Sequence, residues 1–132
     1  MGQMDGKVAI VTGGGSGIGK GIAKAFVDEG CSVVIAARGA ERLEAAAVEL
    51  SSNGGTVVAI QTDVTNEEQM INLFAKTMEQ FGKLDVLVNN SGAFDGGPVE
   101  ELTMEQWQNV LQVNVTGPFL GSREAFKIMK KQ

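Results

Sequence analysis

Residues 12–19, TGGGSGIG, have the clearest capacity for chemistry in this sequence. They follow the apolar run KVAIV and open a helix-length stretch. Glycine lets a phosphate approach the backbone, and the free N–H groups of a helix N-terminus favour an anion. This arrangement predicts a phosphate-binding loop, and the alternative is a tight strand-to-helix turn without a ligand. The residues with the relevant types and spacing are Thr12, Gly13, Ser16, Gly17 and Gly19.

Asn114 is a polar residue within an apolar helical pattern. Asn114 follows Trp107, Val110 and Leu111 at intervals of seven, four and three residues, which places it on their helix face. We expect this face to be buried, so the Asn114 amide needs hydrogen-bond partners. Pro118 has no N–H for the Asn114 carbonyl, so a continuous helix should kink and leave that carbonyl free for a water. The alternative is an amide satisfied by neighbouring backbone.

Strand-like and helix-like segments alternate regularly along the chain. The strand-like runs are nearly continuous in apolar residues, as in strands covered on both faces. Strand–helix–strand units of this kind predict an α/β fold with a parallel sheet. A capping-box pattern at Thr103 and Gln106 begins a longer helix that runs to the end of the chain. The expected strands are 8–11, 33–37, 57–60 and 86–88, and the earlier expected helices are 17–29, 41–52 and 67–81.

Four segments in this order resemble motifs of the short-chain dehydrogenase/reductase family. TGGGSGIG resembles its T-G-x-x-x-G-x-G cofactor loop, and DVT at 63–65 resembles the segment whose Asp contacts the adenine. NNSG at 89–92 resembles the N-N-A-G motif, with Ser91 in place of alanine, and NVTGPF at 114–119 resembles the segment with the catalytic asparagine. The resemblance covers essentially the whole chain.

The resemblance implies a Rossmann-type, doubly wound parallel sheet and a nicotinamide cofactor. It also implies that Asn114 is a catalytic residue that anchors a water in a proton relay. Asn90 is expected to tie neighbouring strands as well. The cofactor-binding residues it implies are Thr12, Gly13, Ser16, Gly17, Ile18, Gly19, Asp63, Val64, Asn89, Ser91 and Gly92.

The end of the second strand indicates which nicotinamide nucleotide is bound. An acid there would bind the ribose 2′-OH, whereas an arginine favours a 2′-phosphate. The segment 32–40 contains no acid, and Arg38 stands where the chain leaves the strand. We therefore expect NADP(H) in preference to NAD(H), with Arg38 on the phosphate and Arg42 as a second contact. The alternatives are that Arg38 only solvates the strand end and that Glu41 binds the ribose.

The family's proton donor is not found in this sequence. Hydride transfer at an alcohol carbon needs such a group, and the family uses a tyrosine with a lysine four residues later and a serine. The sequence has no tyrosine, and the solvated patterns around Lys76, Lys83 and Lys127 do not suggest a substitute. We expect residues 1–132 to be a partial, single dinucleotide-binding domain, truncated before these groups and incomplete at the C-terminal side of its sheet.

Three functions remain open for such a chain. The first is the NADP(H)-binding portion of an oxidoreductase that acts on a carbonyl or hydroxyl carbon of an unidentified small molecule, without alcohol dehydrogenation by these 132 residues alone. The second is a non-catalytic dinucleotide-binding or interaction module. The third is a folded fragment without a ligand. In each case the exposed edge of strand 86–88 and part of the last helix favour a homo-oligomer.

Composition excludes several other classes. The net charge of -5 with dispersed basic residues argues against nucleic acid, and no apolar run is long enough for a membrane helix. With no histidine and one cysteine we expect no metal site. The lone Cys31 fits a cytoplasmic protein, and we expect a buried, inert thiol there instead of a reactive one.

Overall fold

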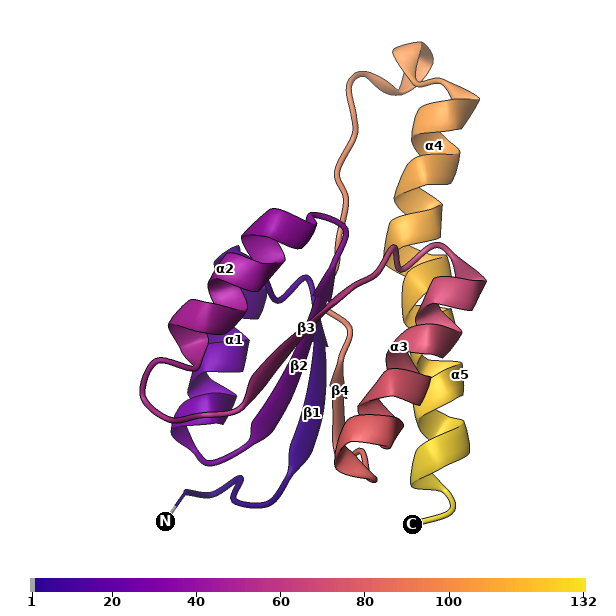
Figure 1. Ribbon diagram of the computed structural model, residues 1–132. Helices are drawn as coiled ribbons and strands as arrows, with labels where there is room; N and C mark the ends of the chain where they lie inside the picture. The colour runs from indigo at the N-terminus through magenta and orange to yellow at the C-terminus, as the bar shows by residue number, and fades with distance from the viewer. Residues whose placement is uncertain (1) are drawn as a thin grey trace.

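The computed structural model describes residues 2–132, and its centre is a four-stranded parallel sheet of order β3-β2-β1-β4 (Figure 1). Valine, isoleucine and alanine dominate the strands, as expected for a sheet covered on both faces. The central β1 and β2 are buried nearly throughout, whereas the edge strand β4 is half-buried. Each predicted strand is confirmed to within one residue at either end. The strands are β1 (Val8–Thr12), β2 (Ser32–Ala37), β3 (Val57–Gln61) and β4 (Val86–Val88).

Helices cover both faces of the sheet (Figure 1), which confirms the predicted doubly wound α/β arrangement. Side chains alternate along each strand, so Ile10 joins the core beside α3 and α5 while Val11 joins the core beside α1 and α2. The three earlier predicted helices are confirmed to within two residues at their ends. The four helices on the sheet are α1 (Gly17–Asp28), α2 (Ala40–Leu50), α3 (Glu67–Phe81) and α5 (Gly117–Met129).

Local sequence explains the limits of α3. The Asn66 side chain accepts a hydrogen bond from the Gln69 N–H at 3.0 Å and caps the N-terminus. Gly82 ends the helix in the left-handed conformation, with φ 74°. Between these ends Met70 and Phe74 are buried, as their spacing predicts, and they anchor α3 on the sheet.

The chain beyond β4 forms a short 3-10 turn, η1 (Val99–Glu101), and then one long helical segment. The capping box predicted at Thr103 is present and starts α4 (Met104–Leu111). A π-helical turn, η2 (Gln112–Thr116), joins α4 to α5. In a π-helical turn each N–H donates to the carbonyl five residues earlier, and Gly117 N–H donates to the carbonyl of Gln112 in this way. The disturbance expected at Pro118 therefore takes the form of a π-helical turn.

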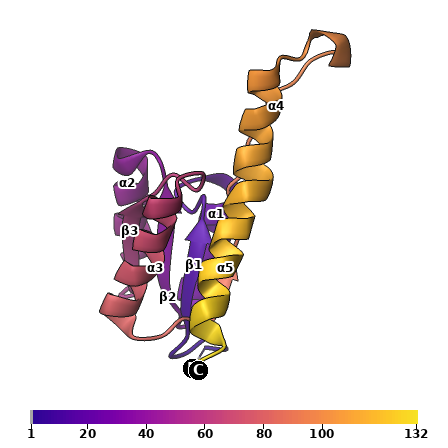
Figure 2. The ribbon, with the colours of Figure 1, turned by 90° about the vertical axis from the view of Figure 1, so that its right-hand side faces the viewer.

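The prediction that the Trp107 face of this helix is buried is wrong. Trp107 and Leu111 are 56% and 38% exposed, and Asn114 is exposed as well. The physical reason is that α4 extends past the carboxyl ends of the strands, so no sheet lies beneath it (Figures 1 and 2). The three residues do share one helix face, as their spacing predicts, but the four-stranded sheet does not reach that face.

Cys31 is buried at 3% exposure, in agreement with the prediction. Burial raises the pKa of its thiol to about 11, so the reactive thiolate is scarce near neutral pH. Within residues 2–132, none of the helices combines the length and apolar character needed to cross a bilayer.

Asp85 connects the start of β1 to the start of β4. The Val8 N–H donates to Asp85 Oδ2 at 2.9 Å, and Lys83 Nζ lies 3.1 Å from the same oxygen. Lys83 also donates to the Gly6 carbonyl at 3.0 Å. Partial burial raises the pKa of Asp85, but the Val8 and Lys83 contacts outweigh it and hold this pKa below its ordinary value. The carboxylate form therefore stabilises the fold.

Asp85→Ala should lower the free energy of unfolding by about 1–2 kcal/mol near neutral pH, because it leaves the Val8 N–H without its acceptor. The folded-state pKa is depressed, so this contribution is present above the ordinary carboxyl pKa and is lost as pH falls through the folded pKa. The free energies of unfolding of Asp85→Ala and wild type should therefore converge at low pH. Urea unfolding of both proteins between about pH 6 and about pH 2.5 measures this.

The matched control is Glu79→Ala, an exposed acid for which we expect a change below about 0.5 kcal/mol. A difference between Asp85→Ala and wild type that persists unchanged at the lowest pH would contradict the role assigned to the carboxylate.

Candidate functional site

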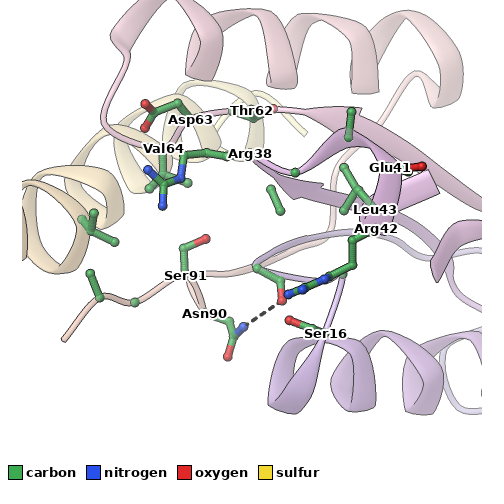
Figure 3. Close-up of a pocket in the computed structure, with 18 of the residues that line it drawn as sticks. Ser16, Arg38, Glu41, Arg42, Leu43, Thr62, Asp63, Val64, Asn90 and Ser91 are labelled. Atoms are coloured by element: carbon green, nitrogen blue, oxygen red, sulfur yellow. Dashed lines mark hydrogen bonds between the residues drawn. The ribbon is translucent and has the colours of Figure 1, made fainter. Parts of the chain in front are cut away.

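A pocket of about 1250 Å³ lies where the carboxyl ends of the strands meet. Open parallel sheets bind ligands at this edge. The pocket walls come from the loop after β1, the turn after β2, the end of β3 and the segment after β4 (Figure 3). Most of the predicted cofactor residues line it, namely Gly13, Ser16, Ile18, Arg38, Asp63, Val64, Ser91 and Gly92.

The glycine loop is shaped by close backbone contacts. Gly13 has φ 68°, its N–H donates to the Ala36 carbonyl at 2.7 Å, and a Cβ there would lie 2.8 Å from Asn90 Nδ2. A Cβ on Gly19 would overlap the Gly13 carbonyl oxygen. Both positions therefore require glycine. Ser16 precedes the first turn of α1, and its hydroxyl forms no capping hydrogen bond, which leaves it available to a ligand.

Thr12 joins the ends of β1 and β4. Its Oγ1 accepts hydrogen bonds from the N–H groups of Asn90 and Ser91, at 3.0 and 3.1 Å, and donates to the Val88 carbonyl at 3.4 Å. Asn90 Nδ2 donates to the Gly13 carbonyl at 3.3 Å. Asn90 thus ties two strand ends, as expected, and Thr12 sets the spacing of two pocket walls from a buried position.

Arg38 and Asp63 lie on the same side of the pocket (Figure 3). Asp63 Oδ1 accepts hydrogen bonds from the Thr65 hydroxyl at 2.7 Å and the Thr65 N–H at 2.9 Å. The Thr65 hydroxyl contributes most to holding the pKa of Asp63 below its ordinary value, and the charge of Arg38 contributes less. Arg38 forms no ion pair within residues 2–132, so its charge is available to a ligand.

Arg42, on the first turn of α2, points from the opposite side of the pocket toward Ser16 (Figure 3). The carboxylate of Glu41 points away from both arginines in the same view. Two guanidinium groups therefore line one cavity from opposite sides, and the carboxylates of Glu41 and Asp63 belong to the same lining. Guanidinium groups are well suited to phosphate oxygens.

Four of the predicted cofactor residues do not line this pocket: Thr12, Gly17, Gly19 and Asn89. Thr12 and Gly19 shape it from behind, as described above. Gly17 lines a separate groove between α1 and residues 49–55. Asn89 donates from Nδ2 to Ser122 Oγ at 3.2 Å and so links β4 to α5.

Asn114 holds the segment after β4 in place. Its Oδ1 accepts from the Ala93 N–H and its Nδ2 donates to the Ala93 carbonyl, each at 2.8 Å. The amide is thus satisfied by backbone, but by backbone 21 residues earlier in the chain. Gly92 and Ala93 line the pocket, so Asn114 positions that wall from outside.

Two glutamines that were not predicted also support the site. Gln61 Nε2 donates to the Arg38 carbonyl at 2.9 Å, and the Asp63 N–H donates to Gln69 Oε1 at 2.7 Å. In the sequence only their positions could have indicated this role, because Gln61 is the last residue of β3 and Gln69 lies in the first turn of α3.

The pocket has the groups needed for a dinucleotide. The glycine loop leaves space where a Cβ would collide, α1 offers the N–H groups of its first turn, and two arginines face the cavity. Among the described residues no three His, Cys, Asp or Glu side chains are grouped to hold a metal ion. The N–H groups of α1 and the two arginines are hydrogen-bond donors that suit phosphates and a ribose.

Comparison with known proteins agrees with this geometry. The family model described as short chain dehydrogenase matches residues 7–132. A curated relative, the short chain dehydrogenase/reductase dpchG of Colletotrichum higginsianum, is 42% identical over 125 residues, which are 94% of this chain and 47% of that protein. An uncharacterized oxidoreductase of Thermotoga maritima is 42% identical over 134 residues, covering 98% of this chain and 51% of the relative.

A solved short-chain type dehydrogenase/reductase from Mycobacterium marinum superposes with a TM-score of 0.94 at 32% identity, over 98% of this chain and 52% of that one. The chain thus spans about half the length of the relatives it matches. With the family model matched from residue 7 to residue 132 and the same fold in a solved member, this chain belongs to the short-chain dehydrogenase/reductase family.

Proposed function

We propose that this chain binds NADP(H) and forms the N-terminal, nucleotide-binding portion of a short-chain dehydrogenase/reductase. The observation that carries the proposal is the convergence of Arg38, Arg42 and the glycine loop on one pocket. Neither Arg38 nor Arg42 forms an ion pair among the described residues, since Asp63 accepts hydrogen bonds from Thr65 and the Glu41 carboxylate points away from both arginines, so both guanidinium groups are available to a 2′-phosphate. The family's nicotinamide cofactor makes a dinucleotide the natural occupant.

The reaction we propose for the whole protein is hydride transfer between the nicotinamide and a carbonyl or hydroxyl carbon of a small molecule. The nucleotide supplies the hydride chemistry when bound. In this proposal the Asn114 carbonyl anchors a water of the proton relay, while its side chain keeps the Ala93 segment in position. These 132 residues contain no tyrosine, so we propose that they bind the nucleotide without oxidising alcohols.

The second candidate function is a non-catalytic dinucleotide-binding module. The pocket supports it as well, because the residues that line it suit nucleotide binding whether or not hydride transfer follows. A chimera that joins this chain to the remaining half of the Thermotoga maritima relative separates the two candidates. Turnover with NADPH by the chimera supports the oxidoreductase, and tight NADPH binding without turnover supports the module. The buried, unpaired Cys31 leads us to place either protein in the cytoplasm.

We also propose that the chain self-associates through its long helical segment. The large apolar residues exposed on this segment recur at intervals of three, four and seven residues, the spacing of one helix face. An antiparallel second copy would place the acidic end around Glu100, Glu101 and Glu105 beside the basic end around Lys127, Lys130 and Lys131. The exposed residues are Met104, Trp107, Leu111, Val115, Phe119 and Phe126.

Arg38→Asp should weaken NADPH binding roughly 10- to 100-fold, because a carboxylate would replace a charge-assisted contact to the 2′-phosphate. NADH lacks that phosphate, and a carboxylate at this position can accept from its ribose 2′-OH, so the NADH affinity should not fall. Nucleotide fluorescence titration of the 132-residue chain measures both affinities.

Lys76→Asp is the control, because it makes the same charge change on the exposed face of α3, away from the pocket. Wild-type NADH binding as tight as NADPH binding, or equal losses for both nucleotides in Arg38→Asp, would refute the proposed 2′-phosphate site.

Val115→Glu should convert the wild-type dimer to a monomer, weakening association roughly tenfold or more, because the two copies would bring like charges together at the centre of the interface. Light scattering on a size-exclusion column measures the mass across a concentration series. Ile71→Glu, at an apolar residue of α3 that is 44% exposed, is the control and should leave the dimer intact. A dimer that survives Val115→Glu would instead point to pairing through the edge of β4.

A further inference from the structure

A side chain extends the pairing of β2 and β3 by one step. The backbone register ends with Ala37 opposite Gln61, and the Thr62 N–H donates to the Ala37 carbonyl at 2.9 Å. The next carbonyl, that of Arg38, accepts from Gln61 Nε2, also at 2.9 Å. The amide of Gln61 thus takes the place of a backbone N–H where the two strands diverge.

This bond acts on a turn whose next residue offers no side-chain support. Gly39 follows as the N-cap of α2, has no side chain to form a cap and has open space at its Cβ position. Arg38 itself has no ion-pair partner among the described residues. Fixing the Arg38 carbonyl therefore restricts the backbone from which its guanidinium group reaches into the pocket (Figure 3).

We infer that Gln61 is a positioning residue that pre-orders Arg38 for the phosphate of the adenosine ribose. This inference rests on the proposed NADP(H) binding. Gln61 lies outside the lining of the pocket, so it does not contact the nucleotide and acts only through Arg38. A turn whose backbone is fixed before binding loses less conformational entropy on binding, and this gain goes to NADPH, whose 2′-phosphate Arg38 would contact, and not to NADH.

The test replaces Gln61 with methionine, which has a similar length but no N–H donor. Gln61→Met should weaken NADPH binding about three- to tenfold, because the turn must then be ordered on binding, and NADH binding less than about twofold. In an Arg38→Ala background the same change should have no further effect on NADPH, because the group that Gln61 positions is gone. Gln80→Met, on the exposed face of α3, is the matched control and should leave both affinities unchanged.

A second measurement does not need the nucleotide. The heteronuclear NOE of the Gly39 backbone N–H, which shares a peptide group with the Arg38 carbonyl, should fall in Gln61→Met in the free chain and stay unchanged in Gln80→Met, with both variants still unfolding in one cooperative thermal transition. An unchanged NOE, equal losses of NADPH and NADH, or a full loss in the Arg38→Ala background would each overturn the role of Gln61. If the wild-type chain binds neither nucleotide, the proposed function fails, and the NOE still decides whether Gln61 orders Arg38.

Discussion

The hydroxyl of Thr12 is the contact on which the geometry of the pocket depends. A single buried oxygen accepts the N–H groups of both Asn90 and Ser91, so the end of β4 cannot separate from the end of β1. The glycine loop begins at the next residue, and Asn90 also donates to the Gly13 carbonyl. The opposing walls of the pocket are therefore fixed to one another through neutral hydrogen bonds in a buried setting, where losing a partner is costly.

The sheet and most of the helices could be predicted because their signals are local. The runs that became β1 and β2 contain only residues suited to burial on both faces, and Gly82 marks the end of α3 because a left-handed residue is needed there. The glycine loop could be predicted for a similar reason, since Gly13 and Gly19 each meet atoms that exclude a side chain. In these segments one local constraint decides the structure.

The wrong or missing predictions concern residues whose burial or contacts depend on a part of the chain far away in the sequence. The spacing of Trp107 and Leu111 does define one helix face, but burial of that face depends on whether another element lies beneath it. Gln61 and Gln69 carry no distinctive spacing, and their value arises only when β2, β3 and α3 bring the carbonyl of Arg38 and the N–H of Asp63 within reach. The partner of Asn114 is likewise a backbone segment 21 residues away, which helix periodicity does not identify.

These contacts share one feature that bears on ligand binding. Uncharged side chains, namely those of Thr12, Gln61, Gln69, Asn90 and Asn114, position the backbone around the pocket. The backbone of Arg38 is consequently held in place by an amide, and its guanidinium group forms no ion pair in the part of the chain that the structure describes. An acid in the place of Gln61 would attract the guanidinium group and compete with a phosphate. Positioning by amides and hydroxyls keeps the cationic groups free for an anionic ligand.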